Sequence, residues 1–289
     1  MKSASVVFGS LLLFAVVVLF GAQENDLHVF APGVISGRDV FAVTFTPDQR
    51  QVYFCETDRE IKHIQIMSSR LVNGKWSEPQ PVAFSTGAYR DVDPALSADG
   101  QHLYFNSNRP AGGEGEPKKD FDTFVADKTG DGWSIPRAVA ELNSPATEIS
   151  PSVARSGNLY FASDRPGGAG EMDIYLARKS GDGFAAPENI REVNTKDAES
   201  NVAVSPDETL LVFARRTGEK TKLYLSRSKN GHWQTPVALG APIRTEDDVE
   251  YAPEFSPDGK RFYYSSTRFE NNKRVKPGTI YWIETTKLK

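Results

Sequence analysis

The stretch TFTPDQRQVYF (residues 44–54) recurs in four variant forms: ALSADGQHLYF (95–105), SVARSGNLYF (152–161), AVSPDETLLVF (203–213) and EFSPDGKRFYY (254–264). When the copies are aligned on Thr46, Ser97, Ala154, Ser205 and Ser256, successive copies lie 51, 57, 51 and 51 residues apart. A period near 50 that contains only strand and turn patterns is typical of a β-propeller. In that fold each repeat forms a blade of antiparallel strands, usually four, around a central channel.

Each repeat predicts four strands in order. The alternating residues before the turn form the innermost strand, and Asp and Gly in the SPDG-type turn tolerate unusual backbone angles. The second strand, such as HLYF (102–105), is rich in the aromatic residues that suit burial on both faces. A third strand such as DIYLAR (173–178) follows. An Asn-Gly or Asp-Gly hairpin then leads to an outer strand that carries a proline, as in NGHWQTP (230–236).

The last repeat lacks its fourth strand, because the sequence ends at Lys289 soon after the third strand around Ile280 to Ile283. A spare strand-like stretch, HVFAPGVIS (28–36), precedes the first inner strand. We expect residues 28–36 to pair antiparallel with the last third strand, since an open ring would leave two sheet edges exposed. The sequence therefore predicts an all-β fold. It is a five-bladed β-propeller of four-stranded antiparallel blades, closed by an N-terminal strand that completes the last blade.

The SPDG turn, the following LYF strand, the SNRP or SDRPGG loop and the DIY third strand resemble the TolB-like, WD-repeat-like propellers of bacterial envelope proteins. The resemblance covers about residues 29–289 and is specific for the fold. It implies a function only broadly, because similar propellers serve as partner-binding scaffolds, as regulators and as domains attached to enzymes. TolB itself resembles a six-bladed ring with a separate N-terminal domain, and neither feature is visible in this sequence.

Charged residues recur at two blade positions. Six residues before the aligned position stand Asp91, Glu148, Glu199 and Glu250, while the first repeat has Val40 beside Asp39. Four residues after the second-strand aromatic stand Arg109, Arg165 and Arg268, with Asp58 and Thr217 in the other repeats. Both positions open on the same face of a propeller. One interpretation is a charged rim that binds a polar ligand or partner. The other is a set of structural ion pairs in which each arginine ties a loop to the carboxylate of a neighbouring blade.

The sequence favours a non-catalytic protein. It contains no G-x-S-x-G motif of a serine hydrolase, and its four histidines are scattered among separate blade positions, so neither a metal site nor a cofactor is predicted. The alternative is a carbohydrate-active hydrolase that draws its acid and base from central carboxylates, namely Asp91, Asp93, Glu148, Glu199 and Glu250. The only cysteine, Cys55, lies in a strand-like stretch and is predicted to be a buried core thiol.

The N-terminus predicts export. Lys2 precedes an apolar or small run from Val6 to Ala22, which is the layout of a signal peptide, although an uncleaved N-terminal anchor has a similar pattern. We therefore expect residues 1–22 to be a signal peptide or anchor and residues 23–289 to be one propeller domain, periplasmic or extracellular. A net charge of −4 argues against a nucleic-acid partner. The expected partner is an envelope protein or a polar or carbohydrate ligand, with membrane contact only through an uncleaved N-terminal segment.

Overall fold

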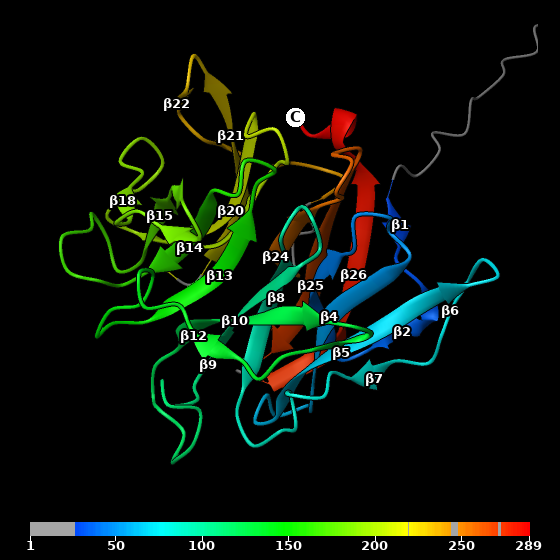
Figure 1. Cartoon of the computed structure of the whole chain (residues 1–289). Helices are drawn as coiled ribbons and strands as arrows, with labels where there is room; N and C mark the ends of the chain where they lie inside the picture. The colour runs from blue at the N-terminus through cyan, green and yellow to red at the C-terminus, as the bar shows by residue number, and fades with distance from the viewer. Residues whose placement is uncertain (1–26, 219, 244–247, 271–272) are drawn as a thin grey trace, which may run out of the picture.

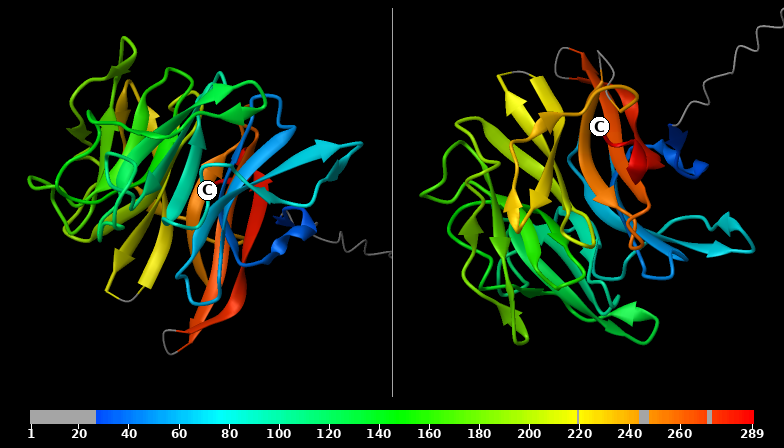
Figure 2. Two further views of the ribbon diagram at one scale, coloured as in Figure 1. Left: turned by 60° about the horizontal axis from the view of Figure 1, so that its bottom comes forward. Right: turned by 90° about the horizontal axis from the view of Figure 1, so that it is seen from above.

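The computed structural model describes residues 27–218, 220–243, 248–270 and 273–289, so the predicted export segment lies outside the described residues. The regular structure is β-strand apart from one short 3-10 helix (Figure 1). No helix among the described residues has the length and apolar character needed to cross a membrane. Five antiparallel sheets follow one another in chain order around a ring (Figure 2). The predicted five-bladed β-propeller is therefore confirmed.

The first two blades follow the predicted order from the channel outward. Blade 1 contains β3 (Val40–Phe45), β4 (Gln51–Thr57), β5 (Ile64–Val72), β6 (Lys75–Trp76) and β7 (Gln80–Pro81). Blade 2 contains β8 (Asp91–Leu96), β9 (His102–Ser107), β10 (Asp122–Thr129), β11 (Gly132–Trp133) and β12 (Arg137–Ala138).

The next two blades repeat this plan. Blade 3 contains β13 (Glu148–Val153), β14 (Leu159–Ser163), β15 (Asp173–Ala177) and β18 (Glu188–Asn189), with β16 (Lys179–Ser180) and β17 (Gly183–Phe184) forming a small hairpin. Blade 4 contains β19 (Ala198–Val204), β20 (Leu210–Thr217), β21 (Lys220–Lys229), β22 (His232–Trp233) and β23 (Val237–Ala238).

The outer strand of blades 1 to 4 is divided into two short pieces. In blade 2, Trp133 lies opposite Lys128 as the hairpin continues, whereas Ala138 lies opposite Phe124 nearer the other end of the same strand. Pro136 stands between the two pieces, where its missing N–H cannot donate a ladder hydrogen bond. The predicted fourth strand is therefore present, but it is shorter than the other strands of the blade.

Blade 5 joins the two ends of the chain. Its strands are β24 (Val249–Phe255), β25 (Arg261–Glu270), β26 (Lys273–Glu284) and β1 (His28–Val29), and the 3-10 helix η1 (Thr285–Lys287) follows. In β1, His28 lies opposite Trp282 and Val29 opposite Tyr281. The predicted closure of the ring by the N-terminus is confirmed, and Figure 1 shows β1 beside β26. The ladder itself is shorter than residues 28–36.

The rest of the predicted latch segment holds β26 by a backbone hydrogen bond from the Phe30 N–H to the Ile280 carbonyl at 2.9 Å and otherwise by side chains. Phe30 is 7% exposed and packs edge-on against Phe45, Trp76 and Tyr263, with ring centroids 5.4 to 5.6 Å away. In β2 (Pro32–Arg38), the Ser36 hydroxyl donates to the Ile280 carbonyl at 3.3 Å and accepts from its N–H at 3.2 Å. β2 thus replaces ladder hydrogen bonds with side-chain ones.

The hydrophobic core lies between blades. In the described part of the chain each neighbouring pair of blades encloses its own cluster of buried side chains. Between blades 1 and 2, for example, Tyr53 and Ile66 pack against Leu103, Phe105 and Phe124. Burying one such side chain fully stabilises the fold by about 1.5–3 kcal/mol. Every blade contributes to two clusters, so each blade is packed against both of its neighbours. This packing holds the five inner strands in place around the channel.

Candidate functional site

The four predicted acidic residues lie on the inner strands, and they are buried. The exposed fractions are 1% for Asp91, 0% for Glu148, 0% for Glu199 and 3% for Glu250. A carboxylate in such a place needs hydrogen bonds or a cation, because burial without them is costly.

Glu148 is held by polar groups of its own blade. It accepts hydrogen bonds from the Ser144 N–H at 3.1 Å, the Ser144 hydroxyl at 2.6 Å and the Ser163 hydroxyl at 3.1 Å. Arg165 completes the set, with 2.9 Å between Arg165 Nη2 and Glu148 Oε1. Burial raises the pKa of Glu148 in spite of these partners.

Glu199 in blade 4 has an equivalent set. The Thr195 N–H and hydroxyl donate to it at 2.9 and 2.6 Å, and Arg215 Nε lies 2.6 Å from its Oε1. Arg215 stands directly opposite Glu199 on β20. The sequence alignment put Thr217 at the arginine position of this blade, so it missed Arg215, which comes two residues earlier.

Asp91 in blade 2 completes this series of three. It accepts from the Ser107 hydroxyl at 2.7 Å and from Arg109 Nη2 at 2.5 Å. Arg109 is 5% exposed. Its guanidinium carbon lies 5.3 to 6.0 Å from the ring centroids of Phe84, Tyr89, Phe105 and Phe124. Such cation–π contacts hold the guanidinium in place.

Blade 5 uses a different acid. Arg268 Nε lies 2.7 Å from Asp248 Oδ1, and Lys276 also pairs with Asp248. Burial works to raise the pKa of Asp248, but hydrogen bonds from Lys276 and Arg268 outweigh it and lower that pKa. Asp39 of the first repeat pairs with Arg274 of blade 5 at 3.1 Å.

The arginine pairs of blades 2, 3 and 4 therefore lie within single blades. The structural interpretation of the sequence placed each pair between neighbouring blades, and that detail is wrong. Arg109 and Arg165 follow the second strand of the blade whose inner strand carries the acid, so these pairs fix the loop at the inner strand, whereas Arg215 lies within the second strand opposite Glu199. The carboxylates of Asp91, Glu148 and Glu199 and their arginines thus bond mainly to one another and to nearby groups of the protein.

A second set of residues, of which the sequence analysis named only Asp93, surrounds the channel axis. Every inner strand has a bulge at the same place, and the bulge residue has a positive φ angle. The five are Ala42 (51°), Asp93 (53°), Ser150 (56°), Asn201 (50°) and Ala252 (46°). Together with the residue that follows each of them, and with Glu254, they line a narrow cavity of about 20 Å³ that we call the neck. Non-glycine residues rarely adopt this conformation. At each bulge the side chain therefore points in a different direction from that of a regular strand residue.

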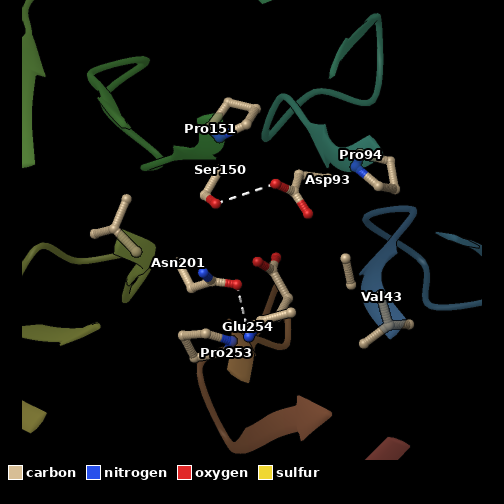
Figure 3. Close-up of a pocket in the computed structure, with 11 residues that line it drawn as sticks. Val43, Asp93, Pro94, Ser150, Pro151, Asn201, Pro253 and Glu254 are labelled. Carbon is tan, nitrogen blue, oxygen red and sulfur yellow. Dashed lines mark hydrogen bonds between the residues drawn. The ribbon is translucent and has the colours of Figure 1, made fainter. Parts of the chain in front are cut away.

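Asp93 and Glu254 are the acidic residues of the neck. Their carboxyl groups point toward the axis from blades 2 and 5, as Figure 3 shows. Burial raises the pKa of Asp93 to about 6, although the Ser150 hydroxyl donates to it at 3.1 Å. Burial also raises the pKa of Glu254 well above its usual value, although Thr44 donates a hydrogen bond to it. No basic side chain contributes to either pKa.

The neck opens into a wider funnel on the face that carries the SPDG-type turns. Inner-strand ends and first turns of all five blades line its volume of about 260 Å³. Pro47, Ala98, Arg155, Pro206 and Pro257 occupy equivalent turn positions around it. Glu254 belongs to the walls of both the neck and the funnel. The largest concave feature on the axis is thus on the opposite face from the predicted rim.

Sequence alignment contained a signal for the neck. Each bulge residue stands four positions before the aligned Thr, Ser or Ala of its repeat. Asp93 was considered only as a catalytic candidate, and Ser150, Asn201 and Glu254 were missed because their types differ from repeat to repeat. Within the described residues, no group of three or more His, Cys, Asp or Glu is arranged to hold a metal ion.

Comparison with known proteins supports the fold. No protein-family model and no curated protein sequence matches the chain. Among solved structures it is similar to TolB from Acinetobacter baumannii, with a TM-score of 0.50, 15% identity and coverage of 86% of this chain and 55% of that one. For a putative TolB from Agrobacterium tumefaciens the TM-score is 0.50 and the identity 13%, over 85% of this chain and 90% of that one.

A prolyl endopeptidase structure has the same TM-score of 0.50. Its identity to this chain is 14%, over 86% of this chain and 39% of the peptidase chain. The chain thus spans about half of the Acinetobacter protein and a smaller part of the peptidase. At these identities the likeness shows the propeller fold and nothing about activity.

Proposed function

We propose that this propeller is an exported, non-enzymatic scaffold that binds a protein segment or polar ligand of the cell envelope in its axial funnel. The TolB-like fold and the apolar run at residues 6–22 motivate the envelope assignment. Concave sites at the mouth of closed β-structures are common binding sites.

The observation that carries this proposal is the contrast between the two faces. On the predicted rim, Asp91, Glu148 and Glu199 are buried and paired with arginines, so a ligand would have to break those pairs. The funnel keeps its polar groups accessible, since Arg155 and Asp258 at its mouth are exposed. The rim can serve as a second contact face for a protein partner that covers it and leaves the ion pairs between acids and arginines intact.

The test is to immobilise the protein and two variants, and to compare the molecules that each retains from an extract of the cell envelope. Ala98→Trp places a large side chain at an exposed funnel position, and Ala186→Trp makes the same change at an exposed position of blade 3 outside the funnel. We expect the mature chain and Ala186→Trp to retain the same molecules, and Ala98→Trp to lose them at an unchanged melting temperature. Equal capture by both tryptophan variants would overturn the funnel as the binding site.

A glycosidase remains a second candidate because Asp93 and Glu254 share one cavity and both have raised pKa values. A carboxyl group that stays protonated is what a general acid requires. Hydrolysis of a panel of nitrophenyl glycosides, abolished in Asp93→Asn, would favour this function over the scaffold. We expect no hydrolysis.

A further inference from the structure

The neck holds two carboxyl groups for which the described part of the chain supplies no counterion. Asp91, Glu148 and Glu199 each have an arginine, and Asp173 accepts hydrogen bonds from the backbone and from Asn189. Asp93, in contrast, accepts from Ser150 alone, and Glu254 from Thr44 alone. Among the described residues, no lysine or arginine forms an ion pair with either.

These two groups are costly where they lie. Their raised pKa values show that burial disfavours the charged form of both. Perturbed carboxyl groups that converge in a cavity are characteristic of binding or catalytic sites rather than of plain structure. Glu254 lines both the neck and the funnel whereas Asp93 lines the neck only, so a molecule that enters from the funnel reaches Glu254 before Asp93.

We propose that the neck is a subsite for a primary ammonium group, carried by the molecule that occupies the funnel and seated between Glu254 and Asp93. This inference rests on the proposed function and names the chemistry of its ligand. The ammonium group supplies the missing positive charge and three N–H donors. A lysine side chain and a small amine share this chemistry.

The hydrogen bonds of the neck favour an ammonium group over a divalent metal ion. The Asn201 Oδ1 atom already accepts from the Ala252 N–H at 3.1 Å, and the Ser150 hydroxyl already donates to Asp93 (Figure 3). Calcium takes six to eight oxygen ligands and magnesium six, whereas an ammonium group needs about three acceptors. Two carboxylates that each accept a hydrogen bond from one hydroxyl, together with one partly used amide oxygen, match the smaller requirement.

The probes are Nα-acetyl-lysine methylamide, its Nε-acetylated form, cadaverine and calcium chloride, each titrated calorimetrically into the mature chain. Glu254→Gln and Asp93→Asn remove the two charges, and Glu116→Gln removes one exposed charge far from the axis as the control. We expect the lysine probe to bind at least about tenfold more tightly than its acetylated form, and to lose about tenfold in either neck variant but not in the control. Preference for the lysine probe over cadaverine identifies a polypeptide as the source, and the reverse identifies a small amine.

Two results would overturn the inference. One is equal binding of the lysine probe and its acetylated form. The other is binding of calcium, but not of either amine, that depends on Glu254. The failure of the proposed function gives a different result: capture from the extract is then unchanged in Ala98→Trp, whatever the probes do. If Ala98→Trp abolishes capture while Glu254→Gln leaves it intact, the funnel is the site and the ammonium subsite is wrong.

Discussion

The carboxyl group of Asp93 is more costly as an anion in the folded chain than in water. Its pKa rises from 3.8 to about 6, mainly through burial, and the nearby titratable groups are Cys55, Tyr251 and Glu254. A carboxyl group whose pKa is raised by folding adds stability at low pH. That contribution is fully present below about pH 4 and is lost as the pH rises through about 6.

We therefore expect Asp93→Asn to stabilise the protein at pH 8 and to change it little at pH 4. The upper limit of the gain is about 3 kcal/mol, from a shift of about two pKa units. Urea unfolding at pH 4, 6 and 8 measures it, with the exposed Asp131→Asn as control. A gain that is the same at all three pH values would show that the charge of Asp93 is not its cause.

At the scale of the element, the ion pair between Arg165 and Glu148 joins the start of β13 to the loop that follows β14. Arg165→Ala would leave a fully buried carboxylate without its cation, at a cost of about 3–5 kcal/mol. We expect a clearly lower melting temperature and unchanged capture of the ligand. Arg178→Ala, which removes an exposed pair with Glu188 at 3.5 Å, should have almost no effect. Lost capture at an unchanged melting temperature would instead make Arg165 a binding residue.

The blades were predictable from the sequence because similar strand and turn residues recur in all five repeats. Turn residues, aromatic strands and Asn-Gly hairpins each impose a local conformation, and all three agree on the blade. The neck was not predicted, because the residue type at the bulge position differs from repeat to repeat. Arg215 was missed for a related reason: it reaches Glu199 directly across the ladder, where the other arginines reach back from a loop.

At the scale of the whole molecule, ring closure depends on a short N-terminal segment. Removing residues 23–36 deletes β1, the buried side chains of Phe30 and Ile35, and the Ser36 hydrogen bonds to Ile280. These contacts sum to roughly 5 kcal/mol. We expect a lower melting temperature and self-association through the exposed edge of β26. Both are measured by comparing thermal unfolding and sedimentation.

The matched control removes residues 23–27 only and keeps β1 intact. It should melt and sediment as the mature chain does. A chain without residues 23–36 that remains monomeric and melts at the same temperature would show that the N-terminal segment does not hold the ring closed.

The joining of the two chain ends in blade 5 also sets a time order for folding. Ser36 in β2 and Ile280 in β26 are separated by 244 residues, so the N-terminal segment leaves the ribosome long before the strand that it contacts. Contacts of such long sequence separation form slowly, because the loop between them must be closed first. β1 and β2 therefore remain without these contacts until β26 has been synthesised. During that interval the nascent chain depends on whatever shields its unpaired strands, and a chaperone is the natural candidate for that role.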